Sequence, residues 1–419
     1  MSQNSTGPEQ HRQRPIEDIL DFCVEVSRRM IMCGANIERV SLALERICNT
    51  YELSDLSLYL LSTHISLSAR DSSGFYASRQ LTIPPAVINL SRLRSLNRLC
   101  YSVSRDKPSS RKLHSLLEEA SDTRDYSDQV VLLAQVCALS CLCLIFGGWI
   151  SEIFCVALIT VLMHYLLVLL AIPGVDRILT NAVVMWIATT AVFFLMNLGI
   201  SDREPLIIMT MVMLVIPGIP LVNAMRNILC GNEMNGILQT AKAFVETMAL
   251  AMGIYVSFLM FGSKEALNET FVSAITNPVL LVILSFFASI CFGAVFRIEP
   301  RDLPLAGLGG VLTRIVLLVL TPFCSRLAYM TAAAFVASLY AELLATLQKK
   351  PSTYYVYPSI IPMIPGDLFF YTLLGIYNHN NKAVALNGYN CALSLAAMSI
   401  GFVLSSAVAH YVRKMKLSK

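Results

Sequence analysis

The feature that most limits the fold of this chain is a series of long apolar runs that follow one another after residue 128. An α-helix needs roughly 20 mainly apolar residues to cross the hydrocarbon core of a bilayer, and the runs have about this length. They predict ten membrane-spanning helices; nine or eleven remain open, because the seventh run is short. The expected spans are residues 130–148, 151–172, 178–199, 205–225, 237–261, 271–296, 303–320, 327–347, 354–377 and 384–411.

Composition excludes two other classes of protein. The chain has 419 residues, of which 55% are hydrophobic and 14% charged, and its mean hydropathy is +0.62. A soluble globular protein is more highly charged, and a disordered chain is far less apolar. The net charge of +4 is too small to suggest a nucleic-acid partner. The lipid bilayer is therefore the partner that composition predicts.

Charge is concentrated at the start of the chain. Residues 1–128 hold 16 of the 32 basic and 16 of the 28 acidic residues. This part has the composition of a water-soluble domain, whereas the remainder is a membrane domain. We expect a disordered N-terminus at 1–14, a cytoplasmic α/β domain at 15–128, and two transmembrane halves at 129–262 and 263–419.

The soluble domain is expected to combine helices with a two-stranded hairpin. Residues 56–68 alternate between apolar and polar side chains, which is typical of a half-buried strand, and 75–83 reads as a second strand. Between them, Asp71-Ser72-Ser73-Gly74 is a turn signal. Helices are expected at 16–32, 36–51, 86–102 and 109–121.

The loop charges predict the orientation. Cytoplasmic loops of membrane proteins are enriched in Lys and Arg. With ten spans and an inner N-terminus, ten basic residues after residue 128 lie on the inner side and four on the outer side. The inner residues are Arg177, Arg226, Arg297, Arg301, Lys349, Lys350, Arg413, Lys414, Lys416 and Lys419, and the outer ones are Arg203, Lys264, Arg326 and Lys382. We therefore expect an integral plasma-membrane protein with both termini in the cytoplasm.

Two Pro-Gly pairs interrupt the expected spans at corresponding places. Pro217-Gly218 lies in the fourth span and Pro365-Gly366 in the ninth. Proline removes a backbone hydrogen bond, so each pair is expected to break its helix beside a cavity. The two spans run in opposite directions, which predicts two inverted five-helix halves with a substrate site near the midplane, as in secondary transporters. The alternative is two ordinary proline kinks.

These residues also carry a family resemblance. The segments concerned are Gly34–Val40, Asn89–Leu93, Phe146–Gly148, Pro217-Gly218, Asn223–Asn227, Gly231, Tyr340–Ala345, Pro351 and Ile361–Gly366. In their order over almost the whole chain they resemble the threonine/serine exporter family in its single-chain form. The chain is also similar to the two-component exporters, whose halves are separate proteins and to which dicarboxylate (succinate) export is assigned.

The resemblance implies a ten-helix transporter with a cytoplasmic N-terminal domain. It further implies export of small amino acids or related acids by means of the proton gradient. The chain departs from the family pattern at Asn227 and Asn232, where acidic residues are usual, and at Asp367, where small residues are usual.

Charged residues inside the spans are the next candidates for a site. A charge at the bilayer centre costs about 2.5 to 3.5 kcal/mol on insertion scales, so it is retained mainly beside a cavity or a partner. Asp367 adjoins a helix break and could bind a substrate ammonium or carry the coupled proton. Glu246 lies near the middle of the fifth span and is a second candidate for proton coupling. Arg314 could bind a substrate carboxylate, or it could form a static ion pair with Glu246 or Asp367.

Asn223 and Arg226 follow the first break. The planar guanidinium of Arg226 could hold a substrate carboxylate, or it could anchor the helix to lipid phosphate. The expected substrate site therefore comprises Pro217, Gly218, Asn223, Arg226, Arg314, Pro365, Gly366 and Asp367.

The sequence offers no enzyme motif. The 12 cysteines form no CxxC pair or metal-binding spacing, and no Walker loop, GxSxG or HExxH occurs. We expect no enzyme activity, no cofactor and no metal. The favoured function is a secondary exporter of threonine- or serine-like amino acids, with dicarboxylates such as succinate as the alternative. A membrane-anchored enzyme or a sensor that uses the cytoplasmic domain is the alternative of another class. A homo-oligomer remains open.

Overall fold

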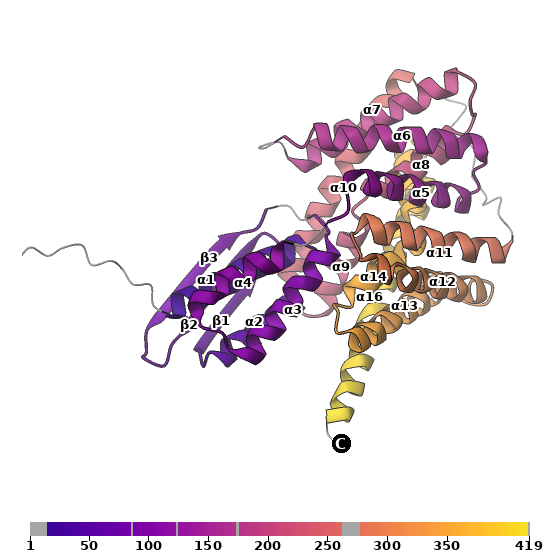
Figure 1. The fold of residues 1–419 in the computed structure, drawn as a ribbon. Coiled ribbons are helices and arrows are strands. Elements are labelled where there is room, and N and C mark those ends of the chain that lie inside the picture. Colours follow the sequence, from indigo (N-terminus) through magenta and orange to yellow (C-terminus); the bar gives the residue numbers. More distant parts are fainter. Residues whose placement is uncertain (1–14, 85–86, 123–124, 173–175, 262–276, 418–419) are drawn as a thin grey trace, which may run out of the picture. The chain divides into compact units, whose positions relative to one another are not determined.

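A computed structural model describes residues 15–84, 87–122, 125–172, 176–261 and 277–417 (Figure 1). The chain divides into two compact units, of which the first ends at Arg124 and the second begins at Asp125. The expected disordered terminus at 1–14 and the expected division between the halves at 262/263 lie outside the described residues.

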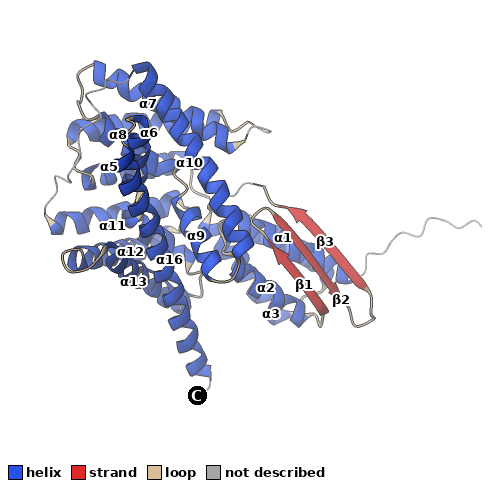
Figure 2. Cartoon of the chain, turned by 180° about the vertical axis from the view of Figure 1, so that it is seen from behind, coloured by secondary structure: helices blue, strands red, loops and turns tan. Residues whose placement is uncertain are grey.

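The first unit is a small α/β domain. Its sheet is antiparallel in the order β1-β2-β3, so β2 is central, and Ile65, Leu67 and Ala69 of β2 are fully buried. Helix α1 packs on β2 and β3, and α2, α3 and α4 pack on α1 (Figure 2). The elements are α1 Pro15–Met32, α2 Ile37–Thr50, β1 Ser54–Leu60, β2 His64–Arg70, β3 Tyr76–Thr82, α3 Leu90–Asp106 and α4 Ser110–Ser121.

The prediction of two strands was wrong, because the sheet has three. The alternating segment 56–68 is not one strand: a tight turn, closed by the Leu61 N–H donating to His64 O at 2.8 Å, separates β1 from β2. The alternation breaks at this turn: Leu61 follows Leu60 directly, and the apolar positions change from even (Leu56, Leu58, Leu60) to odd (Ile65, Leu67). This change of phase was the signal that the prediction of a single strand overlooked. The expected turn at Asp71 is present, and the Asp71 carboxylate accepts hydrogen bonds from the Ser73 and Phe75 amides at 2.8 and 3.0 Å.

The second unit consists of helices. Within the described residues, eight helices are long and apolar enough to cross a membrane, or up to ten if each of two bent pairs is one span. The upper figure is the number that the apolar runs predict. The elements are α5 Asp128–Ile145, α6 Ile150–Leu169, α7 Arg177–Asn197, α8 Glu204–Val215, α9 Gly218–Leu229, α10 Glu233–Phe261, α11 Pro278–Val295, η1 Pro300–Asp302, α12 Leu303–Leu320, α13 Arg326–Gln348, α14 Thr353–Ile360, η2 Ile361–Met363, α15 Gly366–Tyr377 and α16 Asn381–Leu417.

Apolar side chains also cover the outside of this unit. Phe154 and Leu169 of α6 are 57% and 72% exposed, and Phe287 of α11 is 50% exposed. Helices that are apolar all round are typical of membrane spans, because lipid rather than water surrounds them. The chain is therefore an integral membrane protein with a small α/β domain at its N-terminal end.

The membrane unit contains the same arrangement of helices twice. In the first half α5 packs on α6, and α10 packs on α7 and α9; in the second half α11 packs on α12, and α16 packs on α13 and α15. Helix α5 also packs on α11, so the first helices of the two halves are in contact.

The helix ends repeat as well, at nearly constant spacing. Gly147 and Arg297, 150 positions apart, both have a positive φ at the end of the first helix of a half. Each is followed by the same backbone hydrogen bond, from Gly148 to Cys143 O at 2.8 Å and from Ile298 to Gly293 O at 2.9 Å. After the breaks the spacing is 148, as for Gly231 and His379, which again both have a positive φ. Equivalent residues of the two halves are therefore found with an offset of 150 at the end of the first helix and 148 after the break.

Candidate functional site

The two helix breaks have the same local structure. Ile216 and Ile364 are extended, with φ of −62° and −61°, because the proline that follows each of them disfavours the helical conformation. Pro217 and Pro365 both have a φ of −77°, and their ψ angles are 50° and 54°. This is close to an inverse γ-turn. The helices on either side meet at 56° in the first break and 49° in the second, so the prolines break both spans.

The breaks also lie against each other. A Cβ atom on Gly218 would come within 2.8 Å of Ile364 Cγ2, and one on Gly366 would collide with Met213 Sδ. Both glycines therefore lie where the two halves approach closely, although the Met213 side chain is flexible and could move away from a Cβ at position 366. Helix α8 packs on α15 at this contact. The structure thus brings together Pro217-Gly218 and Pro365-Gly366, which are far apart in sequence.

Asp367 is the second residue of α15 and is half-buried. Its carboxyl group interacts with the backbone amides of Asp367 and Leu368, at the start of the helix. The helix N-terminus favours a negative charge at this position. The cation whose charge acts on Asp367 is Arg326, at the start of α13. The sulfur of Cys391, on α16, lies 3.9 Å from Pro365 O beside this carboxyl group.

Arg314 connects α12 to the segment that precedes the second break. Its Nε donates to Ser285 Oγ at 2.9 Å, and its Nη2 donates to Pro362 O at 3.2 Å. The ion pairs among the described residues do not include Arg314 with Glu246 or Asp367. Arg314 is therefore held by a hydroxyl group and a carbonyl group, and not by the static ion pair that the sequence left open.

Asn223 and Arg226 lie on the same face of α9 and have different partners. The Asn223 amide donates to Tyr357 Oη of α14 at 3.0 Å. Arg226 Nη2 donates to Ser406 Oγ of α16 at 3.1 Å. Arg226 Nε is buried and has no hydrogen-bond partner within the part of the chain that the structure describes. This guanidinium can therefore donate a hydrogen bond to a further, anionic ligand.

The structure does not bring Arg226 and Asp367 together. Arg226 contacts Ser406, whereas Asp367 lies beside Cys391, fifteen residues away on the continuous helix α16. That separation corresponds to about 22 Å of helix. One small amino acid cannot contact both groups.

Glu246 lies in a third place. It is half-buried on α10, and the charges that act on it are those of Lys242, Arg177 and Asp176. Arg177 begins α7, so Glu246 belongs to a group of charges near that helix end, and no described hydrogen bond or ion pair joins it to the breaks.

The partners of the candidate residues were not found from the sequence. Ser285, Tyr357 and Ser406 are single polar residues in apolar helices, and nothing in their own spacing indicates their role. The repeat supplies a signal that could have found one of them. His164 and Gln135, 150 positions before Arg314 and Ser285, form the same kind of contact, with His164 Nδ1 2.9 Å from Gln135 Oε1.

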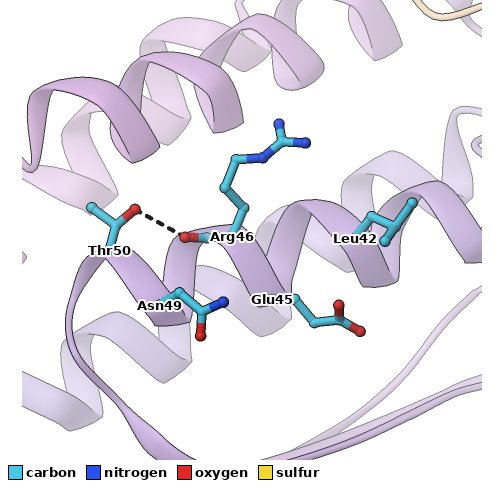
Figure 3. Close-up of a pocket in the computed structure, with 5 residues that line it drawn as sticks. All are labelled: Leu42, Glu45, Arg46, Asn49 and Thr50. Atoms are coloured by element: carbon cyan, nitrogen blue, oxygen red, sulfur yellow. Dashed lines mark hydrogen bonds between the residues drawn. The ribbon is translucent and has the colours of Figure 1, made fainter. Parts of the chain in front are cut away.

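The first unit has a shallow hollow of about 520 Å³ on the face of α2 (Figure 3). Its lining comes from one helix, and the hydrogen bond drawn there joins Thr50 Oγ1 to the Arg46 carbonyl at 2.9 Å. The Arg46 guanidinium lies over the ring of Tyr101, 4.7 Å from its centroid. The lining residues are Leu42, Glu45, Arg46, Asn49 and Thr50.

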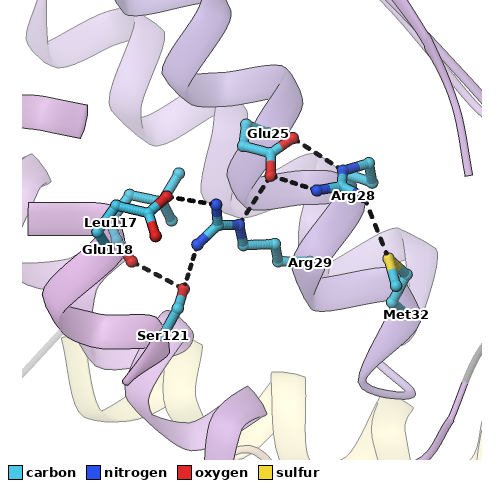
Figure 4. A network of polar contacts seen from close by, with 7 residues as sticks. All are labelled: Glu25, Arg28, Arg29, Met32, Leu117, Glu118 and Ser121. Atoms are coloured by element: carbon cyan, nitrogen blue, oxygen red, sulfur yellow. Dashed lines mark hydrogen bonds and ion pairs between the residues drawn. The ribbon is translucent and has the colours of Figure 1, made fainter. Parts of the chain in front are cut away.

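A polar network ties α4 to α1 (Figure 4). Arg29 bridges two carboxylates, at 2.8 Å from Glu25 and 2.5 Å from Glu118, and it also donates to Ser121 Oγ at 2.6 Å. The hydrogen bond and the charge of Arg29 lower the pKa of Glu118. Burial opposes ionisation of Glu25, but Arg28 and Arg29 together hold its pKa below the usual value. The network fastens the last helix of the domain.

Comparisons with known proteins agree with this architecture. Residues 21–261 match a family described as a threonine/serine exporter, and residues 281–408 match a second family described as "Threonine/Serine exporter, ThrE". Over 137 residues, 32% of this chain, the sequence is 30% identical to "Probable succinate transporter subunit YjjP" of Klebsiella aerogenes. The match spans about half of that relative, 53% of its length. No solved structure matches the chain. Since the first family covers more than half of its residues, the chain belongs to the threonine/serine exporter family.

Proposed function

We propose that this protein is a secondary active exporter of small amino acids of the threonine and serine kind, driven by the proton gradient. The observation that carries the proposal is Arg314, a cation inside a membrane helix whose described partners are the neutral Ser285 hydroxyl and Pro362 carbonyl.

A cation in this position is costly unless an anion reaches it. In membrane helices such a charge pairs with an opposite charge or with backbone carbonyls, and an anion with good geometry compensates more of the cost of removing it from water. Arg314 contacts the turn that leads into the second break, where a solute could approach it. A carboxylate fits a guanidinium through two parallel hydrogen bonds. We assign the solute carboxylate to Arg314.

The helix breaks provide the rest of the site. The matched helices of the two halves support an inverted repeat, which is the usual plan of secondary transporters with a central site. Helices α9 and α15 begin at Gly218 and Gly366, and their first amides and positive dipole ends suit anionic groups. Pro217 and Pro365 create these helix starts.

Asp367 is the group that we assign to the ammonium of the solute or to the coupled proton. A carboxyl group beside a helix break can lose and regain a proton as the surroundings change between water and protein. Glu246 remains a proposal for a proton relay near the start of α7, away from the breaks. We place the protein in the plasma membrane with both termini in the cytoplasm, as the loop charges indicate.

Succinate is the second candidate solute. The relative in Klebsiella aerogenes carries the name of a succinate transporter subunit. The second cation, Arg226, has a buried Nε without a partner in the described residues and could serve another carboxylate on the solute path. Asp367 would repel a dicarboxylate unless protonated, which favours an amino acid.

The test replaces Arg314 in proteoliposomes. Arg314→Gln should lower threonine exchange by more than about tenfold, because a hydrogen bond to a charged group is lost. The matched control is Lys382→Gln, which removes a cation from an exposed position at the start of α16 and should exchange at the wild-type rate. Wild-type exchange by a folded Arg314→Gln variant would contradict the assignment.

A further inference from the structure

The repeat allows contacts between the halves to be compared with their equivalents. Helix α8 corresponds to α14, and α9 corresponds to α15, because Pro217 matches Pro365 at the two breaks. Contact between α8 and α15 therefore has an equivalent contact, between α14 and α9. In a symmetric arrangement both contacts would be equally close.

The two contacts are not alike. Helix α8 packs on α15. Both α8, from Glu204 to Met213, and α14 are buried along their length, so the difference lies in how each packs on the other half and not in burial. Helices α9 and α14 are not among the closely packed pairs of the described residues. What joins them is the hydrogen bond from the Asn223 amide to Tyr357 Oη. The membrane unit is thus closed on the α8–α15 side and held by a side-chain bridge on the α9–α14 side.

The α9–α14 side also has the chemistry to receive a carboxylate. Arg226 lies three residues after Asn223, so both project from one face of α9. Arg226 Nη2 donates a hydrogen bond to Ser406 Oγ, while its buried Nε has no partner in the described part of the chain. Tyr357, on the opposite side of the bridge, is almost fully buried, with 3% exposure. A solute carboxylate that replaced Tyr357 in this bridge would find donors in the Asn223 side-chain amide and in Arg226 Nε.

We propose that α9 and α14 form the solute entrance in this state, with Asn223 and Tyr357 as its gate and Arg226 as the residue that receives the solute carboxylate. The contact of α8 with α15 is the closed gate at the other end. This inference rests on the proposed function, since it deepens the path to the same site. From the loop charges, the entrance faces the cytoplasm, where an exporter loads its solute.

The repeat also predicts the alternative state. At the break, Gly366 lies against Met213 and Gly218 lies against Ile364. In the alternative state each residue takes the contact of its equivalent in the other half, 148 positions away. Gly218 then lies against Ile361, the equivalent of Met213, and Gly366 lies against Ile216, the equivalent of Ile364. Each contact then moves by three residues, about one helical turn. Opening the other end therefore requires the two breaks to slip past each other by one turn while α14 closes on α9.

The test uses single cysteines and a membrane-impermeant thiol reagent. The full chain is used, with the exposed cysteines Cys137, Cys230 and Cys324 replaced by serine. Asn223→Cys and Arg226→Cys report on the entrance. Their equivalents in the second half, Tyr371→Cys and Leu374→Cys, are the matched controls for the closed end.

We expect Asn223→Cys and Arg226→Cys to react from the cytoplasmic face. The controls should react from the external face at least about tenfold more slowly, because a minor conformational state is populated at roughly 10% or less. Equal rates at the two ends, or the reverse order, would overturn the entrance.

A conservative variant tests the gate without a change of fold. Tyr357→Phe keeps the ring and removes the oxygen that accepts the Asn223 hydrogen bond, so it should speed labelling of Arg226→Cys by about three- to tenfold. An unchanged rate would overturn the gate. The labelling assay does not require transport. If labelling follows the expected pattern but threonine is not exchanged, only the proposed solute is refuted. Exchange with symmetric labelling would refute the entrance alone.

Discussion

Arg314 of α12 and Asp367 of α15 are charged side chains near the second helix break, and their environments differ. Arg314 binds a hydroxyl and the Pro362 carbonyl, whereas Asp367 faces backbone amides at a helix start. A fixed cation suits a binding role, because an arginine does not release its proton in a protein. A carboxyl group can do so, and the proton step therefore belongs to Asp367.

Asp367→Asn separates binding from coupling. The amide keeps the shape and the polar contacts but cannot take up a proton, so gradient-driven export should be lost while threonine exchange persists. The measurement is transport in proteoliposomes with and without an imposed pH gradient. Asp202→Asn, an exposed position between α7 and α8, is the control. Full gradient-driven export by Asp367→Asn would remove Asp367 from the coupling step.

At the scale of the elements, each half contains one pair of helices that approach closely at a glycine, α7 with α10 in the first half and α13 with α16 in the second. Gly253 of α10 lies against the Ala182 carbonyl of α7, and Gly401 of α16 lies within reach of the Thr331 carbonyl of α13, where a Cβ would be 2.6 Å away. These glycines are equivalent, 148 positions apart. Small residues allow membrane helices to approach closely, which is how such pairs associate in lipid.

Replacing either glycine by alanine should separate its helix pair. Gly253→Ala and Gly401→Ala are each expected to lower stability by about 1 to 3 kcal/mol, because the added carbon meets a backbone carbonyl that cannot move independently. Gly388→Ala, also in α16, meets only Thr372 at 3.6 Å and should be neutral or stabilise by about 0.5 to 1 kcal/mol. Thermal unfolding of the purified variants in detergent decides between these outcomes. Equal midpoints for all three would contradict the packing argument.

The stability of the contact between α4 and α1, which Arg29 maintains, depends on pH. The pKa values of Glu118 and Glu25 are lowered in the folded domain, so their ion pairs stabilise it above the usual carboxyl pKa of 4.5. That stabilisation is lost as the pH falls below this value and through the lowered pKa values.

Hydrogen exchange of the α4 amides measures this dependence. At pH 7, Arg29→Gln should exchange faster in α4 than the wild type, and the difference should shrink at pH values at which the two carboxyl groups are protonated. Arg111→Gln, an exposed position on α4, is the control and should leave α4 protection unchanged. Unchanged protection in Arg29→Gln at pH 7 would mean that the network does not hold α4.

For the whole molecule, the loop charges predict the orientation. A cysteine in place of Lys382, at the start of α16, should react with an impermeant reagent from outside the cell. A cysteine in place of Lys349, between α13 and α14, should react only from the cytoplasmic side. Both positions are exposed, so access to the reagent is not limited by the fold. External labelling at Lys349 would invert or abolish the proposed topology.

Sequence reasoning succeeded where the signal is local. The length of each apolar run is set by bilayer thickness, and the Asp71 turn and the Pro-Gly breaks depend on their own residues. It failed for the third strand, since the break in the alternation of residues 56–68 at Leu60-Leu61 was overlooked. It also could not identify Ser285 or Tyr357 as partners, because their contacts depend on how separate helices pack.

The most direct test of the account is solute counterflow by the purified wild-type protein in proteoliposomes. Vesicles loaded with unlabelled threonine should transiently accumulate labelled threonine against its gradient, and an imposed proton gradient should drive net transport. Unlabelled serine should compete strongly, and succinate more weakly. Absence of counterflow with threonine, serine and succinate alike, in vesicles that contain folded protein, would contradict the account of an exporter with a carboxylate site at Arg314.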